Sequence, residues 1–367
     1  GPGFENGFRT FRASQGHQYY LNSFALMQLI SGGRPLDEYR RPERCRIFKE
    51  DGLSVLAALR RWLERSTWRP FFAYVHIVDP HWPYYERGFG LIDPELRQLD
   101  RRLSVYDLLH LPKRRRTNAR LRQTPQLREL VARYDEEVRW ADRVFGELRA
   151  ALAELDLERR TLVVIVADHG EEFFEHDSFG HGHDVYEQLI HVPLAFLWPD
   201  DPRFDHMPRR IDEPVSLLDV LPTLSDYLDL PPPPSPIRGH SMRPLLEGTH
   251  DGAWFPVFSE TLGPGASIGG YREGSLKVRL HYRDDDPPRE TSRVQVFDLE
   301  RDPFESSPLR ADEPRVAALV QRAREAHHEV WNERWSRRLN RARKPARAPR
   351  NASERTRERL RALGYVE

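Results

Sequence analysis

The sequence predicts an α/β fold in which a mainly parallel sheet is flanked by helices and followed by a smaller C-terminal antiparallel sheet with a helix. Two apolar runs, residues 71–78 and 162–166, have the length and composition of buried strands. Between them, residues 127–155 place apolar side chains at the spacing of a long amphipathic helix. A strand, a helix and a second strand in this order are typical of a parallel sheet.

The remaining elements of the large domain follow in chain order. Residues 53–63 have helical spacing and lead into the first apolar run. After the second run, residues 194–197 form a third candidate strand, and residues 215 to about 228 form a helix. A run of five prolines and one serine at residues 231–236 ends that helix.

The C-terminal part has the pattern of a small antiparallel sheet. Residues 257–259, 276–280 and 294–297 are short candidate strands with alternating or turn-bounded character. A helix from about residue 314 to residue 331 is expected to cover this sheet. Its predicted apolar face consists of Val316, Leu319, Val320, Ala323, Ala326 and Val330.

These patterns divide the chain into four parts. We expect the large α/β domain to occupy residues 1–230 and a proline-rich linker to occupy residues 231–253. The small subdomain is expected over residues 254–335, and a basic tail with a short terminal helix over residues 336–367.

Composition excludes some classes of function. The 57 basic and 57 acidic residues balance, so the two arginine clusters, at residues 113–122 and 334–350, read as local surface features. Neither cluster accompanies a known nucleic-acid-binding module, and no nucleic-acid partner is expected. The longest apolar runs, of about eight residues, are far shorter than the roughly 20 that a membrane helix needs, so we predict no transmembrane segment within this chain. The single cysteine, Cys45, excludes an internal disulfide.

The most informative stretch is residues 161–191, which holds five of the 15 histidines. Its strand run ends in Asp168-His169-Gly170-Glu171-Glu172, and Gly180-His181-Gly182-His183 follows. The first apolar run likewise ends in a polar cluster, residues 79–84. Because ligands collect beyond the carboxyl ends of strands in open α/β sheets, we expect both clusters to face one cleft. A carboxylate beside an imidazole is a natural half-site for a divalent metal.

At these residues the chain resembles the sulfatase family of the alkaline-phosphatase superfamily. The resemblance covers nearly the whole chain but only the later part of the family's pattern. Its most specific segments are residues 71–84, 167–173 and 180–194, with weaker similarity at residues 215–224, 297–303 and 360–366.

The resemblance implies roles for individual residues. Asp168 and His169 match the family's second pair of metal ligands. Many sulfatases have Asp-Asn there and hold Ca²⁺, whereas the imidazole of His169 favours Mn²⁺ or Zn²⁺. His181 matches a catalytic residue that contacts the sulfate or phosphate and the leaving oxygen. His81 matches the family's other active-site histidine, near the leaving group or the formylglycine, and His183 is expected to bind substrate or support the metal ligands.

The family's nucleophile is a formylglycine made from Cys or Ser in a Cys/Ser-x-Pro-x-Arg motif. Cys45 lacks the proline and arginine of that motif, and Ser306-Ser307-Pro308-Leu309-Arg310 fits it but lies far from the family's position. We therefore expect an N-terminal segment that carries the formylglycine to be missing, which would leave this chain inactive alone.

The resemblance implies a metal-dependent hydrolase of small-molecule or glycan sulfate esters. Two alternatives stay open: a phosphate or phosphonate monoester hydrolase of the same superfamily, and a non-catalytic sulfatase-like binding module. The sequence assigns no localisation, and the resemblance is compatible with a periplasmic or extracellular protein.

Overall fold

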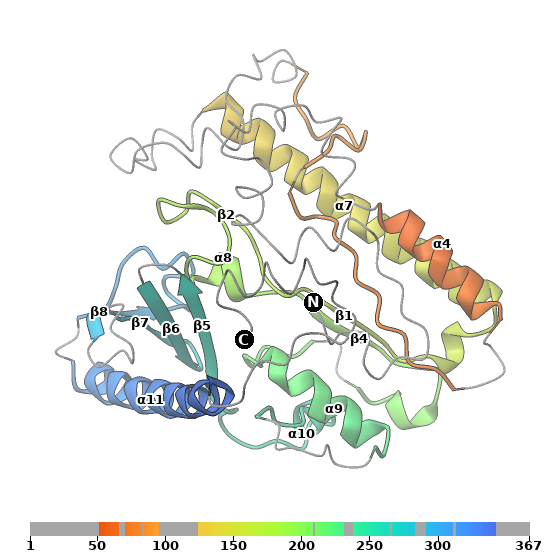
Figure 1. Ribbon diagram of the computed structural model, residues 1–367. Coiled ribbons are helices and arrows are strands. Elements are labelled where there is room, and N and C mark those ends of the chain that lie inside the picture. Colours follow the sequence, from red (N-terminus) through yellow and green to blue (C-terminus); the bar gives the residue numbers. More distant parts are fainter. Residues whose placement is uncertain are drawn as a thin grey trace, which may run out of the picture. The chain divides into compact units, whose positions relative to one another are not determined.

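The computed structural model describes nine stretches of the chain (Figure 1). They are residues 51–65, 70–82, 84–94, 124–207, 210–230, 238–263, 266–282, 291–310 and 313–342. The chain forms two compact units that alternate along the sequence. Of the described residues, the first unit contains those up to Ile165 with Glu172–Phe179 and Leu194–Asp205, and the second contains Val166–Glu171, Gly180–Pro193 and those from His206 onward.

Two helices of the first unit, α4 (Gly52–Leu63) and α7 (Pro125–Glu154), pack against each other. Thr124 starts α7 because its side chain accepts a hydrogen bond from the Leu127 backbone N–H at 3.3 Å, and Pro125 occupies the first helical position. The helix ends before a short 3₁₀ turn, η4 (Glu158–Arg160). Both helices confirm the sequence predictions. Their shared core contains Leu63, Leu152 and Leu157, with Leu59, Trp62, Phe71, Leu148 and Val163 against it.

Strands β1 (Val163–Val166) and β4 (Leu194–Leu197) pair with each other and confirm two of the predicted strands. The prediction of a buried strand at residues 71–78 is wrong for the described part of the chain. These residues are not assigned to a strand, and their side chains alternate between exposed and half-buried, with Phe72 70% exposed. The run is apolar enough for a strand, but no described neighbour supplies the backbone hydrogen bonds that would make it one.

Two adjacent glutamates of α7 are fully buried and fasten the loop at residues 85–91. Glu136 accepts hydrogen bonds from the backbone N–H groups of Gly88 at 3.0 Å and Leu91 at 3.1 Å. Glu137 accepts one from the Tyr85 N–H at 2.7 Å and pairs with the Arg87 guanidinium at 3.0 Å. Carboxylates can be buried here because every charge meets a donor.

The same arginine joins this cluster to the start of α4. Arg87 contacts Asp79 at 2.7 Å and lies 4.7 Å from the centre of the Trp140 ring. The buried Asp79 also accepts the Gly52 backbone N–H at 2.9 Å, at the N-terminus of α4 where a negative charge is favourable. Asp79 is thus held by α4 and Arg87.

In the second unit the 3₁₀ turn η6 (Leu217–Asp219) is continued by α9 (Val220–Tyr227). Ser216 and Asp219 form a reciprocal capping box at this start, which confirms the helix predicted from residue 215. The short helix α10 (Arg243–Leu246) follows, with Leu245 and Leu246 buried. The first unit also contains a 3₁₀ turn, η5 (Pro202–Phe204).

Four antiparallel strands form the C-terminal sheet in the order β5 (Val257–Gly263), β6 (Ala266–Glu273), β7 (Leu276–Tyr282) and β8 (Thr291–Asp298). Helix α11 (Pro314–Ala342) lies against this sheet (Figure 1). The predicted strands and helix are confirmed, while β6 was not predicted. The core between sheet and helix includes Val278, Leu280, Val296, Val316, Leu319 and Ala323.

Several sequence predictions fall outside the described residues. These are Cys45, the arginine cluster at residues 113–122, the proline run at 231–236 and the tail from residue 343. The four domain boundaries remain predictions. None of the described helices combines the length and the apolar character that a bilayer crossing requires.

His327 on α11 makes the C-terminal core sensitive to acid. Its ring stacks on Tyr282 at 4.0 Å and lies over Gly269, and burial lowers its pKa to about 4, with His328 adding to the effect. Above pH 6.5 the ring is neutral in folded and unfolded chains alike. Between pH 6.5 and 4 only the unfolded chain takes up the proton, so the stability present above pH 6.5 is lost as the pH falls.

We expect this proton uptake to cost up to about 3 kcal/mol by pH 4. The His327→Phe variant keeps an aromatic ring on Tyr282 but cannot titrate. Its melting temperature should therefore fall less than that of the wild type between pH 7.5 and pH 4.5, as measured by calorimetry. Equal falls in both proteins would show that His327 does not contribute to the acid sensitivity.

Candidate functional site

The segment after β1 is folded back onto the start of β4 by its own backbone. The Ala167 N–H donates to the Pro193 carbonyl at 3.3 Å, and the Gly170 N–H donates to the Leu189 carbonyl at 2.8 Å. A Cβ at residue 170 would lie 2.0 Å from the Gln188 carbonyl oxygen. Only glycine fits this close approach, which explains the Gly170 of the Asp-His-Gly motif.

Two short paired strands follow, β2 (Glu172–Phe173) and β3 (Phe179–Gly180). The buried Glu172 organises the loop between them, because its Oε1 accepts the backbone N–H groups of His176 and Ser178, both at 2.9 Å. Beyond the hairpin, helix α8 (Glu187–Ile190) precedes β4. Glu171 and His181 flank the two paired strands in sequence.

His181 is oriented by Glu171. The Nδ1 atom of His181 lies 2.9 Å from Oε1 of Glu171, whose side chain is only 6% exposed. A carboxylate oxygen can only accept, so Nδ1 carries the hydrogen and the other ring nitrogen, Nε2, points away from the glutamate. This arrangement matches the carboxylate that fixes a catalytic imidazole in hydrolases. No role for Glu171 was predicted from the sequence, where its only signal was its place in the acidic run after His169.

His169 stacks on His181, with ring centres 3.8 Å apart and an interplanar angle of 24°. Its Nδ1 lies 2.8 Å from the Gly170 carbonyl oxygen and donates to it. The lone pair is then on Nε2, which is 3.7 Å from Oδ1 of Asp168. The structure therefore brings Asp168, His169 and His181 together within one unit, as the sequence predicts.

The donor set of Asp168 and His169 fits half of a divalent metal site. Metal bonds to oxygen and nitrogen of about 2.0–2.2 Å allow one ion to reach two atoms 3.7 Å apart. The backbone hydrogen bond at Nδ1 is the usual device that fixes the ligating tautomer of a histidine. Within the described stretches no group of three or more potential ligand side chains is assembled.

The other two candidate histidines are placed separately. His183 is half-buried and lies two residues beyond His181, beside Asp184. His81 belongs to the first unit, where its N–H donates to the Val78 carbonyl at 2.7 Å and its Nδ1 lies 2.6 Å from the Trp82 carbonyl oxygen. The expected meeting of His81 with the other histidines in one cleft stays a prediction.

The serine that fits the bare nucleophile motif is part of a turn. The Ser306 hydroxyl donates to Oδ1 of Asp302 at 2.8 Å, and the Ser307 N–H donates to its Oδ2 at 2.8 Å. An aspartate that accepts from the following residues is typical of a local turn, and nothing in this arrangement activates the hydroxyl as a nucleophile.

Comparison with known proteins supports the predicted fold. The model of the family described as Sulfatase matches residues 5–230, more than half of the chain. The solved structure of a phosphonate monoester hydrolase from Silicibacter pomeroyi is similar with a TM-score of 0.54 and 21% identity, covering 75% of this chain and 59% of that one. This likeness confirms the predicted α/β fold class.

Two curated relatives match at the level of sequence. Arylsulfatase K from Mus musculus is 31% identical over 195 residues, which are 50% of this chain and 33% of that protein. An endo-4-O-sulfatase from Bacteroides thetaiotaomicron is 28% identical over 183 residues, which are 50% of this chain and 34% of that protein. The chain thus spans about a third of the length of these relatives.

Proposed function

This chain belongs to the sulfatase family, and we propose that it supplies metal-binding and proton-donating residues for the hydrolysis of sulfate esters. The observation that supports this proposal best is the compact cluster after β1. There the imidazole of His181 is held by Glu171 and stacked on His169, which adjoins the carboxylate of Asp168.

His181 is suited to act on the leaving group. With Nδ1–H bonded to Glu171, a protonated ring presents its second N–H at Nε2. The buried carboxylate stabilises the positive ring and fixes its direction, as a general acid requires. The proton at Nε2 would pass to the ester oxygen as its bond to sulfur breaks. We propose His81 as a second catalytic residue of this reaction, and His183 as a residue that binds substrate or supports the metal ligands.

Asp168 and His169 would hold a divalent metal together with ligands from elsewhere in the protein. When bound, such an ion stabilises negative charge on the sulfate oxygens. The resemblance to sulfatases implies a formylglycine nucleophile, for which this chain has no candidate at the family's position. We therefore propose that the chain by itself does not turn over sulfate esters.

The alternative ester class rests on one observation, the imidazole of His169 in place of an oxygen donor at the proposed metal site. Imidazole favours Mn²⁺ or Zn²⁺ over Ca²⁺, and the similar fold of a phosphonate monoester hydrolase does not separate the two classes. The test is the ratio of kcat/KM for 4-nitrophenyl sulfate and 4-nitrophenyl phenylphosphonate, measured on protein that also carries the family's nucleophile segment. A preference for sulfate is expected, and a preference for the phosphonate would favour the alternative.

The metal preference can be tested by one substitution. In protein with the nucleophile segment, His169→Asn replaces the ring nitrogen by an amide oxygen and is expected to shift the bound metal from Mn²⁺ or Zn²⁺ toward Ca²⁺. Metal content after dialysis against all three ions measures the shift directly. His176→Asn, in the neighbouring loop, is the matched control and should leave the metal content unchanged. An unchanged content in His169→Asn would remove His169 from the ligand set.

A further inference from the structure

The C-terminal sheet buries two positive charges on the face opposite its apolar core. Along β7, Val278 and Leu280 point into the core with α11, while Lys277 and Arg279 alternate with them. Lys277 is 1% exposed and Arg279 is 4% exposed. Burial of a charge is costly unless it is paired. The partners of these two side chains therefore show which segment of the chain this face of the sheet binds.

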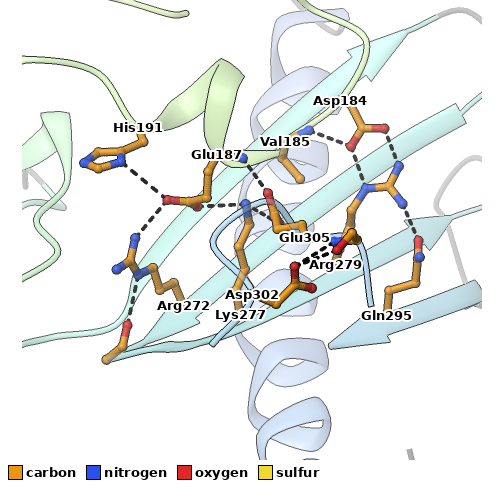
Figure 2. Close-up of polar contacts among 12 residues, drawn as sticks. Asp184, Val185, Glu187, His191, Arg272, Lys277, Arg279, Gln295, Asp302 and Glu305 are labelled. Carbon is orange, nitrogen blue, oxygen red and sulfur yellow. Dashed lines mark hydrogen bonds and ion pairs between the residues drawn. The ribbon is translucent and has the colours of Figure 1, made fainter. Parts of the chain in front are cut away.

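Arg279 forms a two-point ion pair with Asp184, the residue that follows His183 (Figure 2). Its Nε contacts Oδ1 of Asp184 at 2.6 Å, and its Nη2 contacts Oδ2 of the same carboxylate. The guanidinium lies 4.3 Å from the centre of the Tyr186 ring, and Nη1 donates to the side-chain oxygen of Gln295 at 2.6 Å. A forked arginine on a carboxylate fixes direction as well as distance.

Lys277 holds the same segment three residues later. Its Nζ lies 2.8 Å from Oε1 of Glu187 and 2.9 Å from Oε1 of Glu305. Glu187 also pairs with Arg272 at 2.9 Å, and its backbone N–H donates to Glu305 at 2.6 Å (Figure 2). Burial raises the pKa of Glu305, while Lys277 acts in the opposite direction.

A third contact lies on the N-terminal side of His183. The hydroxyl of Thr261, on β5, donates to the Gly182 carbonyl oxygen at 2.7 Å. Residues 182, 184 and 187 are therefore all attached to the C-terminal sheet, and His183 lies between the first two attachments. His181 directly precedes the first of them, and its ring is held from the opposite side of the motif by Glu171.

We propose that the C-terminal sheet positions the candidate active site, with Arg279 and Lys277 as positioning residues that fix residues 182–187 and through them the imidazoles of His181 and His183. The catalytic use of these histidines rests on the proposed function; their positioning does not. The two-point contact between Arg279 and Asp184 indicates that this pair positions residues 182–187 rather than only stabilising the fold. Buried ion pairs contribute little net stability compared with apolar packing, whereas a forked pair defines the place and angle of the backbone it holds.

The test uses the 367-residue chain with ¹⁵N-labelled histidines, because imidazole resonances report ring environment without any need for turnover. The His181 and His183 signals are assigned from the single alanine variants. Arg279→Gln is expected to shift both signals and to weaken the signature of the Nδ1–H bond to Glu171. Arg322→Gln is the matched control, since Arg322 makes an equally forked pair with Glu273 on the same sheet, without contact to residues 182–187.

Unchanged His181 and His183 spectra in a folded Arg279→Gln protein would overturn the proposal. If that variant does not fold, Thr261→Val decides, because it removes only the exposed hydroxyl bond to Gly182. It is expected to shift the His183 signal, and an unchanged spectrum would again overturn the proposal.

In protein that carries the nucleophile segment, Arg279→Gln should lower kcat by roughly 10-fold or more with little change in KM, as for other residues that orient catalytic side chains. Arg279→Lys is expected to restore part of the loss, and a loss confined to KM would contradict positioning. If His181→Ala leaves turnover intact, the proposed function fails, while the imidazole spectra still decide the positioning.

Discussion

Replacement of His181 by alanine is expected to lower the turnover of a sulfate ester by roughly 10²-fold or more, since a general acid typically contributes that much. The measurement is kcat on 4-nitrophenyl sulfate in protein that carries the nucleophile segment. Glu171→Gln should cause a smaller loss, because the amide still contacts Nδ1 but no longer stabilises a positive ring. Asp168→Ala should abolish activity through loss of the metal.

His176→Ala is the control for this series. It lies in the same loop but outside the positions that match the family's motif, and the substitution keeps the backbone N–H that donates to Glu172, so turnover should stay nearly unchanged. Equal losses from the His176 and His181 variants would mean that residues 168–183 form only a polar loop. Full activity of the Asp168 variant would exclude that residue as a metal ligand.

Glu137→Ala is expected to destabilise the folded chain by about 3–5 kcal/mol, the usual cost of removing one partner from a buried ion pair. The substitution removes the buried acceptor of the Tyr85 N–H and one carboxylate partner of the Arg87 guanidinium, which keeps its pair with Asp79. Urea unfolding followed by tryptophan fluorescence measures the change, because Trp140 lies against Arg87.

Glu154→Ala on the same helix is the comparison. Glu154 pairs with Arg60 at 2.6 Å, but both side chains are exposed, and exposed pairs contribute little. Both variants lose a glutamate carboxylate from α7. The difference between their free energies of unfolding therefore measures the effect of burial. Similar unfolding curves for both would show that the Glu137 cluster is not structurally important.

Helix α7 shows how far a sequence pattern can be trusted. Its apolar spacing predicted its position to within two residues, because packing of one face is a local property of the chain. The same spacing placed Val138 on the buried face, yet Val138 is 43% exposed and Glu136 and Glu137 are buried. Their burial depends on backbone donors some 50 residues away, which no local pattern can reveal.

Strand β6 was not predicted because two glycines interrupt it. Glycine weakens a strand on average and usually marks a turn. Here each glycine makes room for a neighbour: a Cβ at Gly269 would lie 2.6 Å from the His327 ring, and one at Gly270 would lie 2.4 Å from the Ser259 hydroxyl. The side chains that need this space lie on α11 and β5. The glycines of β6 are therefore explained by tertiary contacts, which a local sequence pattern does not contain.

The candidate site was predictable where its residues follow one another and not where they pair across the chain. Asp168, His169 and His181 were found from their motifs, and the structure brings them together. Glu171 was not assigned, because its partnership with His181 depends on the pairing of β2 with β3. The partners of Asp79, which is buried against Arg87 and α4, were not predictable from a local pattern, and the cleft expected at the polar cluster after residue 78 stays a prediction.

The alternation along β7 has a consequence for how the sheet is assembled. A slip of one residue in its pairing would turn Lys277 and Arg279 toward α11 and present Val278 and Leu280 to the acidic side chains of Asp184 and Glu187. Each buried charge left without its carboxylate partner would cost several kcal/mol. Hydrophobic burial already opposes such a slip, because Val278 and Leu280 would leave the core, and the two cations that find partners in only one register add to this discrimination.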